Sequence, residues 1–246
     1  MNSVTIGHND IFRIDDVEFH IDNAAPSDRR KSQLDSFTIV KDRELVEFYF
    51  DLARSLRVNS LLELGIFEGG GYVFLDKLFK PKKMSAVDLR ETPVDALVDY
   101  TKRRDARHVH FRTSQNDERA LTSILENDLG GELDMVVDDA SHDYFLTRRS
   151  FELLFPRLSA GGSYIIEDWA WSHQTPFQGP GAPGAQKPAL TNLVFDLIQL
   201  QGSTNLIAET RVCRSMVIVQ KSKKINACPK DIFSLIRNRG KNLNQI

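Results

Sequence analysis

The chain has 246 residues, 41% of them hydrophobic and 27% charged, which is the composition of an ordinary globular protein. Its formal net charge of -2 argues against a dedicated nucleic-acid binder, and no apolar run approaches the roughly 18 residues of a membrane span. Two cysteines, Cys213 and Cys228, are too few for a disulfide framework, and residues 1–10 lack a signal-peptide pattern, so a cytoplasmic location is expected.

Residues 1–40 are weakly patterned and are interpreted as an N-terminal extension or cap. Within them, residues 11–21 alternate between apolar and polar side chains, which predicts a short strand or hairpin. Residues 24–33 are polar and predict a loop. The main domain is placed at 41–221, and it opens with apolar residues at helical spacing in 42–56.

From residue 59 onwards, short apolar runs alternate with amphipathic segments. The apolar runs predict strands at 59–65, 83–88, 109–112, 134–139 and 163–168. The segments between them predict helices at 72–79, 94–104, 118–127 and 145–158. This alternation predicts an α/β fold, a Rossmann-like, doubly wound and mostly parallel sheet of about seven strands. The sheet is expected to close with an antiparallel pair at its C-terminal end, 205–211 and 215–221.

A segment rich in glycine and proline, 172–188, interrupts this alternation before a predicted helix at 190–200. So long a loop inside a compact domain is usually functional or disordered, and we expect it to act as a mobile lid. Beyond the main domain the chain is basic, and residues 222–246 are expected to form a solvated tail.

The first predicted strand of the main domain leads into a glycine turn, with Glu63, Gly65 and Gly69, and the second strand ends in Asp88. A glycine turn at a helix N-terminus lets a polar or anionic ligand approach closely. Asp88 lies about 20 residues beyond Gly69, where an acid can accept hydrogen bonds from ribose hydroxyls. Phe67 stands where a dinucleotide fold would have glycine, which argues against a nicotinamide-dependent dehydrogenase. The alternative is that these glycines only make a tight turn.

The pattern Glu63-x-Gly65-x-x-x-Gly69 resembles the Glu/Asp-x-Gly-x-x-x-Gly motif of class I methyltransferases that use S-adenosylmethionine. In that family the loop holds the methionine part of the cofactor, and the resemblance implies that Glu63 positions the loop or the amino group. It also implies an adenine contact after the third strand, at Ser114 and Gln115. The alternative for this stretch is a helix N-cap, at Ser114, Asn116 or Asp117.

Two predicted strands end in acidic pairs, Asp138-Asp139 and Glu167-Asp168. Ligands bind at the carboxyl ends of the strands in an open α/β sheet. If the two strands are neighbours, about 5 Å apart, three carboxylates (Asp139, Glu167 and Asp168) would repel one another unless a cation neutralised them. All-oxygen ligation suits Mg2+ or Mn2+ rather than Zn2+. The alternatives are a helix N-cap at the first pair and an exposed strand end at the second.

His142 follows Asp139 by three residues, near the expected start of the next helix. A neutral imidazole there could take a proton from a substrate hydroxyl, and the alternative is a surface histidine that caps the helix. Trp169, Trp171 and His173 are candidates for the substrate pocket, because indole faces suit a sugar ring or an aromatic acceptor. Core packing is the alternative for the two tryptophans.

Four segments carry a more specific resemblance: Asp138-Asp139-Ala140-Ser141-His142, 150–158, Gly161-Gly162 and 164–168. Together they resemble the metal-dependent sugar O-methyltransferases of macrolide biosynthesis, of the macrocin and mycinamicin type, and the related cephalosporin-hydroxylase and rhamnosyl-methyltransferase group. The resemblance covers roughly residues 60–170. It implies that the metal ligands are Asp139, Glu167 and Asp168, with His142 as general base. Asp138 would then act behind the ligands or on the cofactor side.

The resemblance implies an O-methyltransferase that uses S-adenosylmethionine and Mg2+ or Mn2+ and acts on a hydroxyl of a sugar or glycosylated natural product. Its expected partner is this small-molecule acceptor, with no nucleic acid and no membrane span, and the sequence is compatible with a homo-oligomer. Two other interpretations stay open. One is a catechol-like phenol O-methyltransferase, and the other is a non-catalytic module that binds S-adenosylmethionine.

Overall fold

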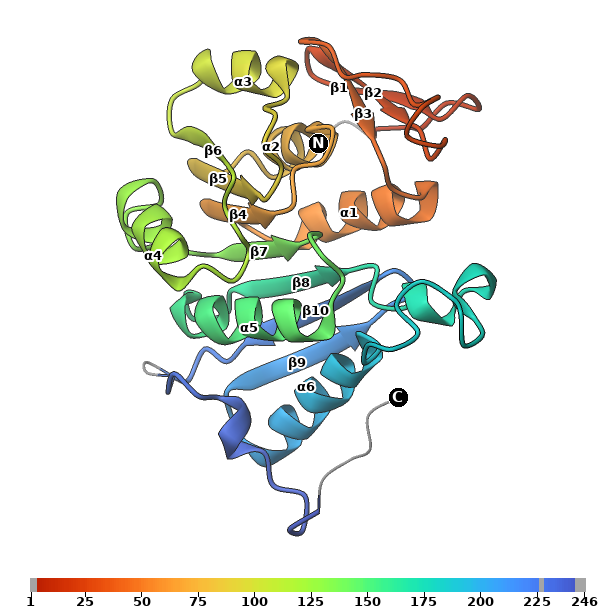
Figure 1. Cartoon of the computed structure of the whole chain (residues 1–246). Helices are drawn as coiled ribbons and strands as arrows, with labels where there is room; N and C mark the ends of the chain where they lie inside the picture. The colour runs from red at the N-terminus through yellow and green to blue at the C-terminus, as the bar shows by residue number, and fades with distance from the viewer. Residues whose placement is uncertain (1–3, 226–227, 242–246) are drawn as a thin grey trace. The chain divides into compact units, whose positions relative to one another are not determined.

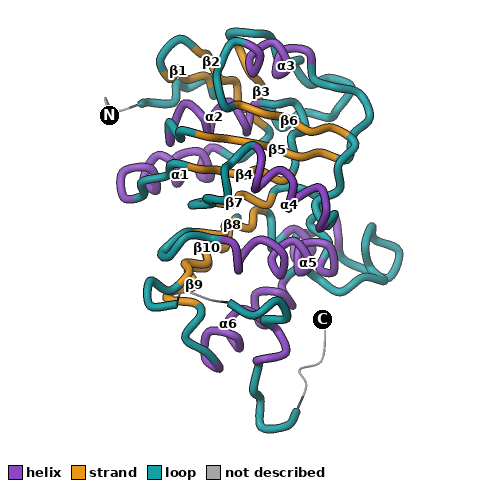
Figure 2. Tube along the Cα trace, turned by 90° about the vertical axis from the view of Figure 1, so that its left-hand side faces the viewer, coloured by secondary structure: helices purple, strands orange, loops and turns teal. Residues whose placement is uncertain are grey.

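The computed structural model describes residues 4–225 and 228–241 of the chain. The chain divides into two compact units, Met1–Ser114 and Gln115–Ile246. Strands and α-helices alternate between Ser36 and Val212, whereas the first unit begins with three consecutive strands and the second contains two consecutive strands after its last α-helix (Figure 2). Within the described residues, no helix has the length and apolar character needed to cross a membrane.

The first unit contains six strands and three helices within the described residues. In chain order they are β1 (Ile11–Ile14), β2 (Val17–Ile21), β3 (Ser36–Ile39), α1 (Arg43–Ser55), β4 (Ser60–Leu64), α2 (Gly70–Phe79), β5 (Lys83–Asp88), α3 (Asp95–Lys102) and β6 (Arg107–Phe111) (Figure 1). The strands β6, β5 and β4 lie side by side and run parallel. Every residue of β4 is buried, as expected for a strand covered on both faces.

The N-terminal strands form a separate three-stranded sheet in the order β1-β2-β3. The predicted hairpin is confirmed, since β1 and β2 pair antiparallel with Ile14 opposite Val17. The strand β3, which pairs parallel with β2, was not predicted. Its four residues are too few to establish an alternating pattern, and the pairing with β2 depends on a contact that local sequence does not reveal.

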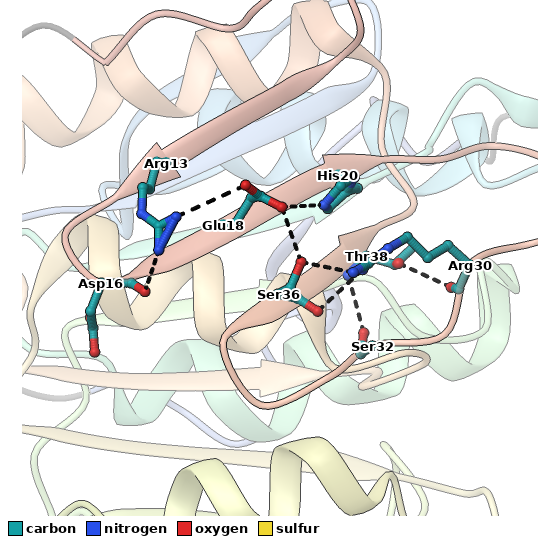
Figure 3. A network of polar contacts seen from close by, with 8 residues as sticks. All are labelled: Arg13, Asp16, Glu18, His20, Arg30, Ser32, Ser36 and Thr38. Atoms are coloured by element: carbon teal, nitrogen blue, oxygen red, sulfur yellow. Dashed lines mark hydrogen bonds and ion pairs between the residues drawn. The ribbon is translucent and has the colours of Figure 1, made fainter.

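This small sheet has one polar face and one apolar face, as the period of two in a strand requires. On the polar face, Glu18 is hydrogen-bonded to His20 at 2.7 Å and accepts a hydrogen bond from the Ser36 hydroxyl at 3.4 Å (Figure 3). The hydrogen bond with His20 lowers the pKa of Glu18. On the apolar face, Phe12 and Phe19 are buried.

The apolar face of the sheet packs on α2, and this contact explains one glycine of the turn. The rings of Phe12 and Phe19 meet Phe74 of α2 edge to face, at 5.9 Å and 6.0 Å between centroids. At the start of α2, a Cβ on Gly70 would lie only 1.9 Å from the carbonyl oxygen of Thr38. The close approach of β3 therefore requires glycine at position 70.

Gly70→Ala is expected to lower the free energy of unfolding by about 3 kcal/mol, because the added methyl group collides with backbone rather than with a movable side chain. The control is Gly202→Ala in α6 (Thr191–Ser203), where a Cβ would have no neighbour within 4 Å. It should leave stability unchanged or raise it by up to about 1 kcal/mol. Urea denaturation measures the free energy of unfolding of both variants. Equal values would contradict the close approach of the Thr38 carbonyl oxygen to Gly70.

The second unit contains four strands and three α-helices within the described residues. In chain order they are α4 (Glu118–Asn127), β7 (Met135–Asp138), α5 (Tyr144–Leu154), β8 (Ser163–Glu167), α6 (Thr191–Ser203), β9 (Ile207–Val212) and β10 (Met216–Lys221) (Figure 1). The strands lie in the order β7-β8-β10-β9. The pair β7 and β8 is parallel, and β10 runs antiparallel to both β8 and β9, which confirms the predicted antiparallel closing pair.

Two segments of this unit differ from their predictions. The predicted helix 145–158 ends as α5 at Leu154 and continues as a 3-10 turn, Phe155–Arg157. In the predicted basic tail, Ile232 and Phe233 are buried, and the ring of Phe233 lies 5.8 Å from that of Phe151. Part of the tail therefore packs on α5, while residues 226–227 and 242–246 of the tail lie outside the described residues.

Candidate functional site

The glycine turn of the first unit follows β4 directly. Glu63 is 1% exposed, and Gly65 and Gly69 have φ values of +94° and +82°, a backbone conformation that favours glycine. Gly69 is the N-cap of α2. The predicted geometry of a loop at a helix N-terminus, which can bind a polar ligand through backbone N–H groups, is therefore present.

Asp88, the predicted ribose acceptor, holds this loop in place. Its Oδ2 accepts hydrogen bonds from the backbone N–H groups of Ile66 at 2.8 Å and Phe67 at 3.0 Å, and its Oδ1 accepts one from Arg90 N at 2.8 Å. Phe67 needs such support because its φ is +46°, which is uncommon for a non-glycine residue. A carboxylate oxygen has two lone pairs, so Oδ1 can accept a second hydrogen bond, from a ribose hydroxyl.

The N-terminal extension covers the same loop. The Ser32 hydroxyl donates to the carbonyl oxygen of Glu68 at 2.8 Å, and Lys31 Nζ lies 2.9 Å from Glu68 Oε1. The guanidinium carbon of Arg29 lies 4.9 Å from the centre of the Phe67 ring. The extension and the glycine loop therefore pack together within the first unit. Ser114, a predicted adenine contact, is half-buried after β6.

Two of the three acidic residues predicted to meet at the strand ends of the second unit, Asp139 and Asp168, lie close together. Since β7 and β8 are parallel neighbours, Asp139 and Asp168 follow adjacent strands at the same edge of the sheet. Each of Asp139, His142 and Asp168 offers a donor atom, and these atoms all lie within 4.8 Å of one another. His142 Nε2 lies 3.7 Å from Asp139 Oδ1. Two carboxylate oxygens and an imidazole nitrogen, partly open to solvent, fit a divalent cation.

Left-handed backbone at two positions brings these side chains together. His142 has a φ of +50° and Asp168 a φ of +51°, so the chain turns sharply after each strand. The next helix starts at Tyr144, one residue before the predicted start at 145, with Asp143 as its N-cap. The alternative interpretations, Asp138-Asp139 as the N-cap and His142 as a histidine that caps the helix, are therefore wrong. Asp143 takes the capping role because its carboxylate accepts from the N–H groups of Phe145 and Leu146.

Glu167, the third predicted metal ligand, differs from the other two carboxylates. It is the last residue of β8, lies opposite Met216 of β10 and is only 1% exposed. Among the described residues, the group of three whose donor atoms lie within 4.8 Å of one another does not include it. Its role as a ligand stays a prediction.

Asp138 lies one residue before the cluster and belongs to a buried polar network. Its Oδ2 accepts a hydrogen bond from the Tyr164 hydroxyl at 2.8 Å, and its Oδ1 accepts one from Gln115 Nε2 at 3.2 Å. Burial raises the pKa of Asp138 to about 7, although the hydrogen bond from Tyr164 lowers it. Asp138 is 2% exposed, so its side chain is buried next to the cluster, and its predicted role behind the ligands or on the cofactor side stays a prediction.

The raised pKa of Asp138 predicts a pH dependence of stability. The folded state holds a proton that the unfolded state releases near its ordinary pKa of 3.8, so this contribution to stability is present at low pH and is lost as pH rises to about 7. The free energy of unfolding of the wild type should therefore fall relative to that of Asp138→Asn across this window. Urea denaturation in EDTA at several pH values measures the difference, and a constant difference would contradict the shift.

The segment predicted as a lid, 172–188, and Trp171 directly before it contact the turn that carries His142 and Asp143. The Trp171 indole N–H donates to the carbonyl oxygen of His142 at 3.1 Å, and Lys187 Nζ donates to Asp143 Oδ2 at 2.8 Å. The Trp171 ring also packs on Phe177, with 4.8 Å between centroids. Trp171 thus contacts both the turn and Phe177 of the predicted lid, and its role at a substrate stays a prediction.

The other two predicted substrate contacts are also hydrogen-bonded within the second unit. The Trp169 indole N–H donates to the carbonyl oxygen of Cys213 at 2.8 Å, and His173 Nε2 is hydrogen-bonded to the Thr191 hydroxyl. The rings of Trp169 and His173 lie 6.2 Å apart. These contacts fix the start of the segment.

Tyr164 and Ser150 are polar residues of this site that sequence reasoning missed. Tyr164 lies within a buried strand and Ser150 within a helix, so only their spatial proximity to Asp138 and Gln115 reveals a role. A signal existed for Tyr164, because a tyrosine in a fully buried strand needs a partner for its hydroxyl.

No protein-family model matches the chain. Demethylmacrocin O-methyltransferase of Streptomyces fradiae is 37% identical over 84 residues, which are 34% of this chain and 21% of that protein. Mycinamicin VI 2''-O-methyltransferase of Micromonospora griseorubida is 33% identical over 139 residues, 54% of this chain and 32% of that protein. A rhamnosyl tetracenomycin-C 3'-O-methyltransferase of Streptomyces olivaceus is 32% identical over 155 residues, 61% and 37% of the two chains.

Solved structures show the same fold. The MycE methyltransferase from the mycinamycin biosynthetic pathway, in complex with Mg, SAH and mycinamycin VI, has a TM-score of 0.53 at 23% identity, over 76% of this chain and 50% of that chain. SAH-bound PaMTH1 of Podospora anserina has a TM-score of 0.55 at 16% identity, over 74% of this chain and 80% of that chain. The predicted α/β fold, with seven mostly parallel strands and an antiparallel closing pair, is confirmed.

The predicted relationship is also confirmed at the level of distant homology. The chain is related over part of its length to sugar O-methyltransferases of the macrocin, mycinamicin and rhamnosyl type. It spans between 21% and 37% of the length of the curated relatives it matches.

Proposed function

We propose that the chain is an S-adenosylmethionine-dependent and divalent-metal-dependent O-methyltransferase that acts on a hydroxyl of a sugar or glycosylated natural product. The observation that carries this proposal is the meeting of Asp139, His142 and Asp168 at the carboxyl ends of β7 and β8. Similarity to O-methyltransferases of demethylmacrocin and mycinamicin VI supports a glycoside as the acceptor class.

In this proposal the first unit binds the cofactor, which supplies an electrophilic methyl group when bound. The glycine loop, supported by Glu63, Gly65 and Gly69, holds the methionine part against the N-terminus of α2. Asp88 accepts a hydrogen bond from a ribose hydroxyl through Oδ1 and keeps the loop in place through Oδ2. Ser114 is the proposed adenine contact.

The second unit provides the metal ligands and the base. Asp139 and Asp168 would hold the cation, with Glu167 as the third carboxylate in the proposed ligand set. A bound Mg2+ or Mn2+ lowers the pKa of an acceptor hydroxyl and fixes its oxygen. His142, whose Nε2 lies 3.7 Å from Asp139 Oδ1, takes the hydroxyl proton as general base.

Calorimetry with the purified chain tests the cofactor and the metal separately. We expect micromolar binding of S-adenosylmethionine and S-adenosylhomocysteine, no binding of NAD, and binding of Mn2+ that Asp139→Ala removes. A chain that binds neither S-adenosyl compound would overturn the proposal. Binding of the cofactor without binding of any divalent cation would leave only the non-catalytic module or a metal-independent enzyme.

A further inference from the structure

We propose that Gln115 is a positioning residue for the turn that carries Asp139 and His142, and that it does not contact adenine. This inference rests on the metal site of the proposed function. Gln115 is 6% exposed, and both ends of its side-chain amide are used inside the second unit. An amide engaged in this way has little left to offer a cofactor base.

The side chain of Gln115 links both sides of the turn. Its Oε1 accepts a hydrogen bond from the backbone N–H of Ser141 at 3.1 Å, the residue directly before His142. Its Nε2 donates to Asp138 Oδ1 at 3.2 Å, the residue directly before Asp139. One side chain therefore fixes the residues that precede the proposed metal ligand and the proposed base.

A third contact holds the amide itself in place. Gln115 Nε2 also donates to the Ser150 hydroxyl oxygen at 2.9 Å, and that hydroxyl donates to the carbonyl oxygen of Leu146 in the same helix. Since Ser150 belongs to α5, the amide is anchored to the helix that follows the turn. The amide thus connects β7, the turn and α5.

Glutamine suits this position because a primary amide offers an acceptor and two donors at once. The acceptor faces a backbone N–H, and the donors face a carboxylate and a hydroxyl. The turn needs such support because His142 adopts a left-handed conformation that costs free energy for a non-glycine residue. Without the amide, the turn would lose its hydrogen bond at Ser141, and the donor atoms of the cluster would be less well ordered.

The test compares Mn2+ binding with S-adenosylhomocysteine binding in Gln115→Met, which keeps the length of the side chain but removes both hydrogen-bonding groups. Residues that orient metal ligands typically change metal affinity by about 10- to 100-fold when substituted, so the Kd for Mn2+ should rise by roughly this factor. The Kd for S-adenosylhomocysteine should stay unchanged. Gln199→Met makes the same chemical change on the exposed side of α6 and should alter neither value.

A loss of S-adenosylhomocysteine affinity with unchanged Mn2+ affinity would overturn the inference and restore the adenine contact. Unchanged affinity for both ligands would also overturn it. If the wild type binds no Mn2+, the metal site of the proposed function fails, which is a different result. Ser150→Ala is the second variant in case Gln115→Met does not fold, and it should weaken Mn2+ binding by a smaller factor with no effect on S-adenosylhomocysteine.

Discussion

Asp139→Asn is expected to lower kcat/KM for methyl transfer by about 10³-fold, because the proposed metal contributes several kcal/mol and each 1.36 kcal/mol is tenfold in rate. Asparagine keeps the shape of the side chain but removes the charge that pairs with a cation. The wild type should lose activity in EDTA and regain it with Mg2+, whereas the variant should stay inactive at any Mg2+ concentration that restores the wild type.

Asp99→Asn is the matched control, since it makes the same change on the exposed surface of α3, where the carboxylate lies 3.8 Å from Lys102. It should retain wild-type activity and the same response to Mg2+. Full activity of Asp139→Asn in EDTA would show that the acidic strand ends do not serve a metal.

His142→Asn should lower kcat by roughly 10²- to 10⁴-fold, the usual contribution of a general base. Asparagine is chosen because it tolerates the left-handed backbone that His142 adopts, so the turn is disturbed as little as the substitution allows. The Kd for Mn2+ should change little if His142 is the base.

The same variant separates the two roles that the geometry leaves to His142, because one of its ring nitrogens lies within 4.8 Å of a carboxylate oxygen of Asp139 and of Asp168. A large rise in the Kd for Mn2+ would make His142 a metal ligand and would contradict its role as base. His108→Gln on β6, an exposed histidine of the first unit, is the control and should affect neither kcat nor metal binding.

The order and type of the main elements followed from hydrophobic periodicity. The predicted bounds of α4 and β5 agree with the structure residue for residue, because a capping aspartate marks the start of α4 and buried apolar residues fill β5. The strand β3 escaped prediction because its four residues are held by pairing with β2. Tertiary contacts of this kind leave no local pattern.

The chemical character of the site followed from acids at strand ends, but its geometry did not. No local motif predicts the positive φ values of His142 and Asp168. The N-cap of α5 is Asp143 rather than Asp138 or Asp139. The role of Gly70 depends on the backbone of Thr38, which is remote in sequence. Gln115 was assigned to adenine from its place in the chain, whereas its burial and partners point to the turn.

The most direct test of the proposed function is the transfer of a labelled methyl group from S-adenosylmethionine to a panel of glycosides and catechols in the presence of Mg2+. We predict Mg2+-dependent label on a sugar hydroxyl of at least one glycoside, removed by EDTA and by Asp139→Asn. Label on catechols alone would replace the acceptor class with phenols. No transfer to any acceptor, from a chain shown to bind S-adenosylmethionine and Mn2+, would contradict the assignment as a sugar O-methyltransferase.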